Sequence, residues 1–157
     1  MAMSFEEAMK SEKIRHLGVA PVARVERDAS LREAMGIMRN NRLGCVLVCQ
    51  GERLAGILTE RDLVKKVFGE SVDLNAPVEK FMTANPRTLP LDASVADAMR
   101  LMEAGGFRSV PLVDDRGRLA GVVAVRHLID YLAEHFPAEV LNLPPRLHQT
   151  MEAPEGA

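Results

Sequence analysis

An internal repeat is the feature that most constrains how this 157-residue chain can fold. The segment that begins Asp28-Ala-Ser-Leu-Arg-Glu-Ala-Met returns in the second half of the chain as Asp92-Ala-Ser-Val-Ala-Asp-Ala-Met. Farther on, Arg53-Leu-Ala-Gly returns as Arg118-Leu-Ala-Gly, with one additional residue between the two matches. The additional residue falls in a turn, where a length change costs little. We therefore expect two copies of one structural unit, joined in tandem.

Each copy carries the same order of predicted elements, β-α-β-β-α. A Ser-x-x-acid pattern, Ser30 with Glu33 and Ser94 with Asp97, marks the start of the first helix in each copy. Apolar residues then recur at helical spacing, and short apolar runs on either side of a turn indicate two strands. The expected ranges are Val22–Val25, Cys45–Cys49, Leu54–Leu58 and Glu60–Val67 in the first copy, and Arg87–Leu89, Ser109–Val113, Leu119–Val123 and Val125–His135 in the second. The predicted fold class is α+β.

The division that follows from the repeat has four parts. Residues 1–17 precede the repeats, and a capping pattern of Ser4 with Glu7 predicts a helix over residues 4–16. Residues 18–76 form repeat one and residues 77–137 form repeat two, with a short helical turn expected at Val78–Met82. Residues 138–157 are rich in proline and are expected to be an extended tail.

Composition excludes several classes of function. Apolar residues make up 47% and charged residues 27% of the chain, which is typical of a globular protein. A net charge of −2 without a basic block argues against nucleic-acid binding. No apolar run is long enough to cross a membrane, and the first residues do not resemble an export signal. With only two cysteines, a reducing cytoplasm is the expected location.

The most informative motif is Gly56-Ile-Leu-Thr59-Glu-Arg-Asp62, where a predicted strand passes directly into a predicted helix. The hydroxyl of Thr59 can donate to a phosphate, and the carboxylate of Asp62 can accept both hydroxyls of a ribose. Backbone N–H groups at the helix start favour the same anion. The alternative is structural: Thr59 caps the helix and Asp62 favours its first turn.

This motif, at the end of a repeated β-α-β-β-α unit, closely resembles tandem CBS domains, the module named after cystathionine β-synthase. Further matches are Arg108-Ser-Val-Pro-Leu-Val-Asp114 and Arg118-Leu-Ala-Gly121, and the resemblance covers about residues 18 to 137. It implies two units packed through their sheets with pseudo-two-fold symmetry and two clefts for an adenosine ligand such as AMP, ADP, ATP or S-adenosylmethionine. Carried onto this chain, the first cleft comprises Thr59, Arg61, Asp62, Arg87, Thr88, Leu89, Arg108, Ser109, Val110 and Pro111.

The second cleft departs from the family pattern. Ala124 and His127 stand where repeat one has Thr59 and Asp62. Alanine cannot bind a phosphate, and a neutral imidazole cannot accept two ribose hydroxyls. We therefore expect this cleft to be empty or to take a different ligand. It would comprise Arg24, Val25, Gly44, Cys45, Val46, Ala124, Arg126 and His127.

Other residues favour structural interpretations. Cys45 and Cys49 are too far apart along one strand for a disulfide and are expected to pack in the core. The four histidines show no metal-ligand spacing, so no metal site is predicted. The methionine-rich helices are expected to form core and, by the family resemblance, the seam of a homodimer. Arg61, Arg118 and Arg126 are solvated charges unless they contact a phosphate, whereas Arg108 fits either role.

Three functions remain open at this point. The first is a regulatory module that requires no cofactor, binds an adenine nucleotide as a regulatory ligand and signals to an unknown protein partner in trans. The second is a docking or dimerisation module of the same fold that binds no nucleotide. The third is a hydrolase, which the absence of a recognisable catalytic set disfavours. Asp62 contacts a ribose common to every candidate ligand, so the sequence does not choose among them.

Overall fold

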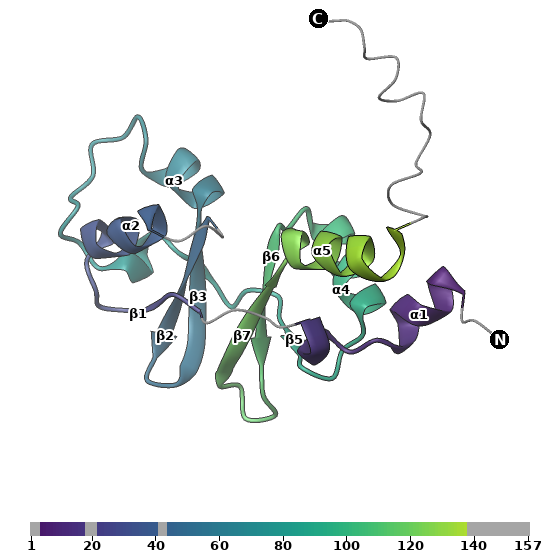
Figure 1. Ribbon diagram of the computed structural model, residues 1–157. Helices are drawn as coiled ribbons and strands as arrows, with labels where there is room; N and C mark the ends of the chain where they lie inside the picture. The colour runs from purple at the N-terminus through teal and green to yellow at the C-terminus, as the bar shows by residue number, and fades with distance from the viewer. Residues whose placement is uncertain (1–3, 18–21, 41–43, 138–157) are drawn as a thin grey trace, which may run out of the picture.

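The protein forms two α+β halves whose sheets lie next to each other at the centre of the molecule (Figure 1). The computed structural model describes residues 4–17, 22–40 and 44–137. The first half contains β1 (Arg24–Glu26), α2 (Leu31–Arg39), β2 (Cys45–Gln50), β3 (Arg53–Thr59), α3 (Glu60–Lys66), the 3-10 helix η2 (Val78–Lys80) and β4 (Thr83–Ala84). The second contains β5 (Leu89–Pro90), α4 (Val95–Gly105), β6 (Ser109–Val113), β7 (Leu119–Ala124) and α5 (Val125–His135). Before the repeats come α1 (Phe5–Ser11) and the 3-10 helix η1 (Ile14–Leu17).

The two sheets confirm the repeat strand by strand. In the first, β1 runs parallel to β2, and β2 pairs antiparallel with β3. In the second, β5, β6 and β7 pair in the same way. The register slips at the same place in both, between Val48 and Cys49 and between Leu112 and Val113. An irregularity shared by both copies is expected of two copies of one unit, because each must bend its strand at the same point.

The segment that precedes each repeat packs onto the other repeat. The N–H of Val78 donates to the carbonyl of Ala29 at 2.7 Å, and the N–H of Ile14 donates to that of Ala93 at 2.9 Å. These bonds are equivalent, since Ile14 matches Val78 and Ala29 matches Ala93 at the offset that relates the two repeats. Figure 1 shows the consequence: α1 lies beside the second half of the molecule, although it precedes the first. The chain segments before the repeats are thus exchanged between the two halves.

This exchange corrects the helix predicted over residues 4–16. The helix ends at Ser11, because Glu12 and Lys13 turn into an extended segment alongside repeat two. There the carbonyl of Glu12 accepts from the N–H of Val95 at 2.9 Å. The capping box of Ser4 with Glu7 is confirmed, and so is the helical turn predicted at 78–82. The predicted tail, residues 138–157, lies outside the described residues.

The core is divided into three clusters. One lies within each half, under the helices, and the N-terminal residues Met9 and Ile14 belong to the cluster of the second half. The third cluster joins the two sheets and contains Cys45, Leu47, Ile57 and Val122. Cys45 and Cys49 are both buried and unbridged, as the core interpretation predicts. Apolar burial between the sheets therefore holds the two repeats together.

Candidate ligand site at the junction of the repeats

The start of α3 is fixed by a reciprocal capping box between Thr59 and Asp62. The hydroxyl of Thr59 accepts from the N–H of Asp62 at 3.3 Å. In return the Oδ2 atom of Asp62 accepts from the N–H of Thr59 at 2.9 Å and from its hydroxyl at 3.0 Å. The motif thus has the geometry of the structural alternative, in which both residues stabilise the helix start. This cap does not exclude a ligand role, because the second carboxylate oxygen lies outside it.

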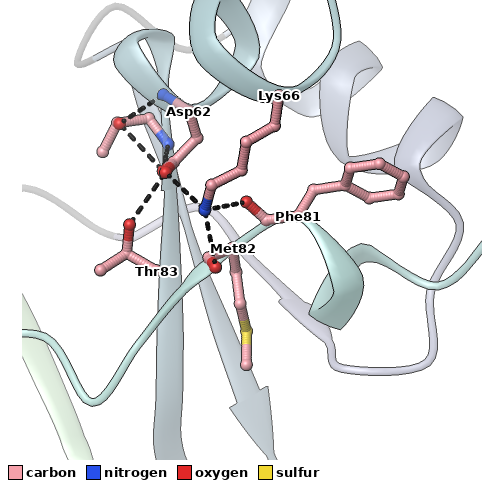
Figure 2. A network of polar contacts seen from close by, with 6 residues as sticks. Asp62, Lys66, Phe81, Met82 and Thr83 are labelled. Atoms are coloured by element: carbon pink, nitrogen blue, oxygen red, sulfur yellow. Dashed lines mark hydrogen bonds and ion pairs between the residues drawn. The ribbon is translucent and has the colours of Figure 1, made fainter. Parts of the chain in front are cut away.

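The second oxygen, Oδ1 of Asp62, contacts side chains that hold the segment between the two repeats (Figure 2). It accepts from the hydroxyl of Thr83 at 2.8 Å and lies 3.1 Å from the Nζ atom of Lys66. Lys66 also donates to the carbonyls of Phe81 at 2.9 Å and Met82 at 3.2 Å. We call Asp62, Lys66 and Thr83, with these two carbonyls, the Asp62 clasp. It ties residues 81–83 to α3, at its start through Asp62 and at its end through Lys66.

Backbone packing supports the same attachment. Residues Thr83 and Ala84, as β4, pair with Ile57 and Gly56 on β3. A Cβ on Gly56 would meet the side chain of Met82 and lie 2.9 Å from the backbone carbonyl oxygen of Thr83, so this close approach requires a glycine. The strand β4 was not predicted, because two exposed residues give no periodic signal.

The two halves of the predicted first cleft come close at Arg61. A Cβ built on Gly106 would lie 4.0 Å from the Nη2 atom of Arg61. Gly106, in the left-handed conformation, ends α4 just before Arg108 and Ser109. The motif of repeat one therefore faces the loop of repeat two that leads into Val110 and Pro111. Arg87, Thr88 and Leu89 follow the clasped segment and enter β5.

Burial separates the predicted residues into two groups. Asp62 is only 5% exposed, and Val110 and Pro111 are buried in β6. Arg61, Arg87 and Arg108 are exposed, and Thr59, Thr88, Leu89 and Ser109 are intermediate. The accessible chemistry on the described surface of this predicted cleft is thus mainly that of guanidinium and hydroxyl groups, with the carboxylate beneath.

The second motif builds only one half of this cap, and with different chemistry. The N–H of Ala124 donates to the Nδ1 atom of His127 at 2.9 Å, so an imidazole nitrogen takes the place of the Asp62 carboxylate. Partial burial and the nearby Arg126 lower the pKa of His127 below its ordinary value. The ring is therefore neutral at pH 7, with its proton on Nε2, because Nδ1 accepts.

The remaining residues of the second cleft lie in or beside β1 and β2. Val25, Cys45 and Val46 are buried, and Arg24 is exposed and donates to the carbonyl of Gly51. The hydroxyl of Ser109 hydrogen-bonds the thiol of Cys45. These two residues occupy equivalent positions at the starts of β2 and β6, so the pseudo-two-fold axis passes close to them. Burial raises the pKa of the Cys45 thiol, which therefore stays protonated.

A groove of about 820 Å³ lies between the helices of the two repeats. It brings together residues from both predicted clefts: Arg108 and Ser109 from the first, and Gly44, Ala124 and Arg126 from the second. Its other lining residues are mostly apolar and come from α2, α3 and α5 and the ends of these helices: Met35, Met38, Arg39, Glu60, Leu63, Val64, Phe68, Val125 and Ile129. The remaining predicted residues, Asp62 included, do not line it.

Four of these groove residues are large, apolar and exposed. Val64 is 63%, Phe68 56%, Ile129 54% and Val125 36% exposed. None of the four was predicted as a site residue. The signal was present, however, because Val64 with Phe68 and Val125 with Ile129 are apolar pairs at i, i+4 spacing, although Phe68 lies in the turn just after α3. We call these four residues the apolar face.

The comparisons with known proteins agree with this architecture. A family model described as CBS domain matches residues 7–69 and 78–134, so the chain belongs to the CBS domain family. An uncharacterised 17.7 kDa protein from Acidianus ambivalens is 34% identical over 117 residues, which are 74% of this chain and 70% of that protein. The chain spans only 33% and 16% of two further curated relatives.

Solved structures show the same fold. The CBS-domain protein ATU1752 from Agrobacterium tumefaciens is 31% identical, with a TM-score of 0.67 over 76% of this chain and 97% of that one. The CBS domain protein PAE2072 from Pyrobaculum aerophilum, solved in complex with AMP, has a TM-score of 0.69 over 78% of this chain and 98% of that one. Its 24% identity shows the shared fold alone.

The helices of the described residues are too short or too polar to cross a membrane.

Proposed function

We propose that this chain is a regulatory module that binds one adenine nucleotide between its two repeats and passes that signal to a protein partner. It requires no cofactor and performs no reaction. The ribose would bind Asp62, Arg61 and Arg108 would contact the phosphates, and Thr59 would hold Asp62 in place through the helix cap. The adenine would lie against residues 87–89 and 109–111.

One observation carries this proposal: the Thr59–Asp62 motif of repeat one faces the Gly106–Arg108 loop of repeat two, with Arg61 reaching toward that loop. A ligand with a diol and a phosphate needs an acceptor carboxylate and cationic donors on opposing walls. The fold of a CBS protein solved with AMP supports the same choice.

The surrounding charge favours an anionic nucleotide over S-adenosylmethionine. Arg61 of repeat one reaches toward the loop of repeat two that leads into Arg108. The cationic sulfonium of S-adenosylmethionine would be repelled by these guanidinium groups, whereas a phosphate gains bidentate hydrogen bonds from them.

Thermal unfolding with AMP, ADP, ATP, S-adenosylmethionine and NAD tests this function. A nucleotide at a hundred times its Kd should raise the midpoint by about 5–10 °C. Asp62→Asn should abolish that rise. The matched control is Asp97→Asn, since Asp97 forms the same capping box at α4 away from the cleft. No rise with any ligand would leave a docking module as the function.

The apolar face supports a second element of the proposal, a homodimer whose seam is at α3 and α5 instead of the methionine-rich helices α2 and α4. Val64 on α3 and Ile129 on α5 occupy equivalent positions, since each is the fifth residue of its helix. A pseudo-symmetric surface of this kind can pair with itself about a two-fold axis. Sedimentation velocity should show a dimer for the unmodified chain and a monomer for Val64→Ser with Ile129→Ser. A monomer for both would contradict this element.

A further inference from the structure

The Asp62 carboxylate has no remaining capacity for a ribose. Its Oδ2 atom accepts two hydrogen bonds from Thr59. Its Oδ1 atom accepts a hydrogen bond from the hydroxyl of Thr83 and forms an ion pair with Lys66. An ionised carboxylate offers about four acceptor positions, so all of them are occupied. A ribose that donates two hydroxyls to Asp62 must therefore displace partners that are already bound.

The partners differ in how readily they can leave. The Thr59 contacts belong to the helix cap, and their loss would unmake the start of α3. Thr83 and Lys66 instead reach Oδ1 from outside the cap, and the Lys66 side chain is 39% exposed. Lys66 also keeps two carbonyl partners if it moves away from Asp62. Oδ1 is thus the atom that can change partners at the lowest cost.

The displaced partner Thr83 belongs to the segment between the repeats. It forms β4 with Ala84, and Asn85, with a φ of 49°, ends that strand. Two residue pairs hold β4 to β3, and the N–H of Asn85 also donates to the carbonyl of Ala55 at 3.2 Å, so the attachment is short and the Thr83 side chain is a substantial part of it. The same segment continues into residues 87–89, which enter β5 of repeat two.

From these contacts we infer that the Asp62 clasp competes with the nucleotide: ribose binding to Asp62 and attachment of β4 to repeat one are mutually exclusive. This inference rests on the proposed function and names how the site regulates. Nucleotide binding releases residues 83–85 from repeat one, while Lys66 keeps its bonds to the carbonyls of Phe81 and Met82. A ligand shifts an equilibrium only through different affinities for its two states, and the exchange of partners at Oδ1 supplies that difference.

Two variants test the competition, and each removes one side chain that competes with the ribose for the Oδ1 atom of Asp62. Thr83→Val keeps the shape and the strand propensity, and Lys66→Met keeps the length of the side chain. Each should bind AMP or ATP about fivefold more tightly in isothermal titration, since one competing hydrogen bond is lost. Lys65→Met is the matched control, because Lys65 is exposed, neighbours Lys66 on α3 and lies outside the clasp. It should bind like the unmodified chain.

Hydrogen exchange supplies the second measurement. On addition of nucleotide, the amides of residues 83–85 should exchange faster, while amides of β6 and β7 stay protected. Slower exchange at residues 83–85, or unchanged or weaker binding by both variants, would overturn the competition and leave the nucleotide site standing. Absence of binding by the unmodified chain and all variants would overturn both the competition and the proposed function.

Discussion

The two motifs at the ends of β3 and β7 both cap the helix that follows, the first with two side chains and the second with one. At α3, the Asp62 carboxylate satisfies the backbone with one oxygen and contacts Thr83 and Lys66 with the other. At α5, the one accepting nitrogen of His127 is already bonded to the N–H of Ala124. A carboxylate has two oxygens and a neutral imidazole has one acceptor, so only the first motif connects its cap to another segment.

The second repeat makes an equivalent attachment by another residue. Tyr131 occupies the position in α5 that Lys66 occupies in α3, and its hydroxyl donates to Glu12 of the N-terminal segment at 3.3 Å. Both positions therefore fasten the segment that crosses from the other repeat. Both repeats thus hold the segment that crosses over from the other repeat. In repeat one, the carboxylate of the motif, Asp62, takes part in holding it.

Removal of the two capping side chains should have the largest and most unequal effect. Asp62→Ala takes away a cap and leaves Lys66 and Thr83 without their shared partner, which should cost about 2–3 kcal/mol of unfolding free energy. His127→Ala removes only one hydrogen bond to the backbone and should cost about 1 kcal/mol. Urea unfolding measures both, and equal losses would show that the clasp contributes nothing.

Conversion of the second motif into the first should stabilise the chain by a smaller amount. Ala124→Thr with His127→Asp supplies a hydroxyl cap and a carboxylate at the start of α5, for a gain of about 1 kcal/mol. His127→Asp alone is the control for the added charge. A loss of stability in the double variant, measured by urea unfolding, would mean that the His127 ring packs in a way that an aspartate cannot replace.

The smallest of the three expected effects is a pH dependence of stability that arises from His127 in the second motif. Because the pKa of His127 is lowered in the folded chain, the unfolded chain binds this proton more readily. Its contribution to stability is present above the ordinary histidine pKa and is lost as pH falls below it. His127→Asn should flatten the fall in urea midpoint between about pH 7.5 and pH 5.5. An unchanged profile would assign that fall to other groups.

Much of the fold was predictable because the repeat supplies each element twice. The strand β6 and the helix α5 have the predicted ends, and the other predicted ends within the repeats differ by a residue or two. The exchanged segments were missed because residues 12–17 and 76–81 share no identical residue when the repeats are aligned. What they share is apolar character at Ile14 and Val78 and a set of backbone hydrogen bonds. Backbone hydrogen bonds do not depend on side-chain identity, so the sequence does not reveal them.

The candidate site was predictable only in part. The capping chemistry of Thr59 and Asp62 follows from their spacing, and an Asp62–Lys66 ion pair is readable as an i, i+4 contact. Thr83 is distant from Asp62 in the sequence, and only the folded chain brings the two together. The burial of Asp62 is therefore a property of the tertiary structure, and it changes the motif from an open ligand site into one with competing partners.

The number of nucleotides bound per chain decides whether the first motif alone forms a site. Isothermal titration with AMP and with ATP should give one nucleotide per chain for the unmodified protein and for His127→Asn, and none for Asp62→Asn. Two nucleotides per chain, or undiminished binding by Asp62→Asn, would contradict this assignment, because the ligand would then not depend on the carboxylate that distinguishes the repeats.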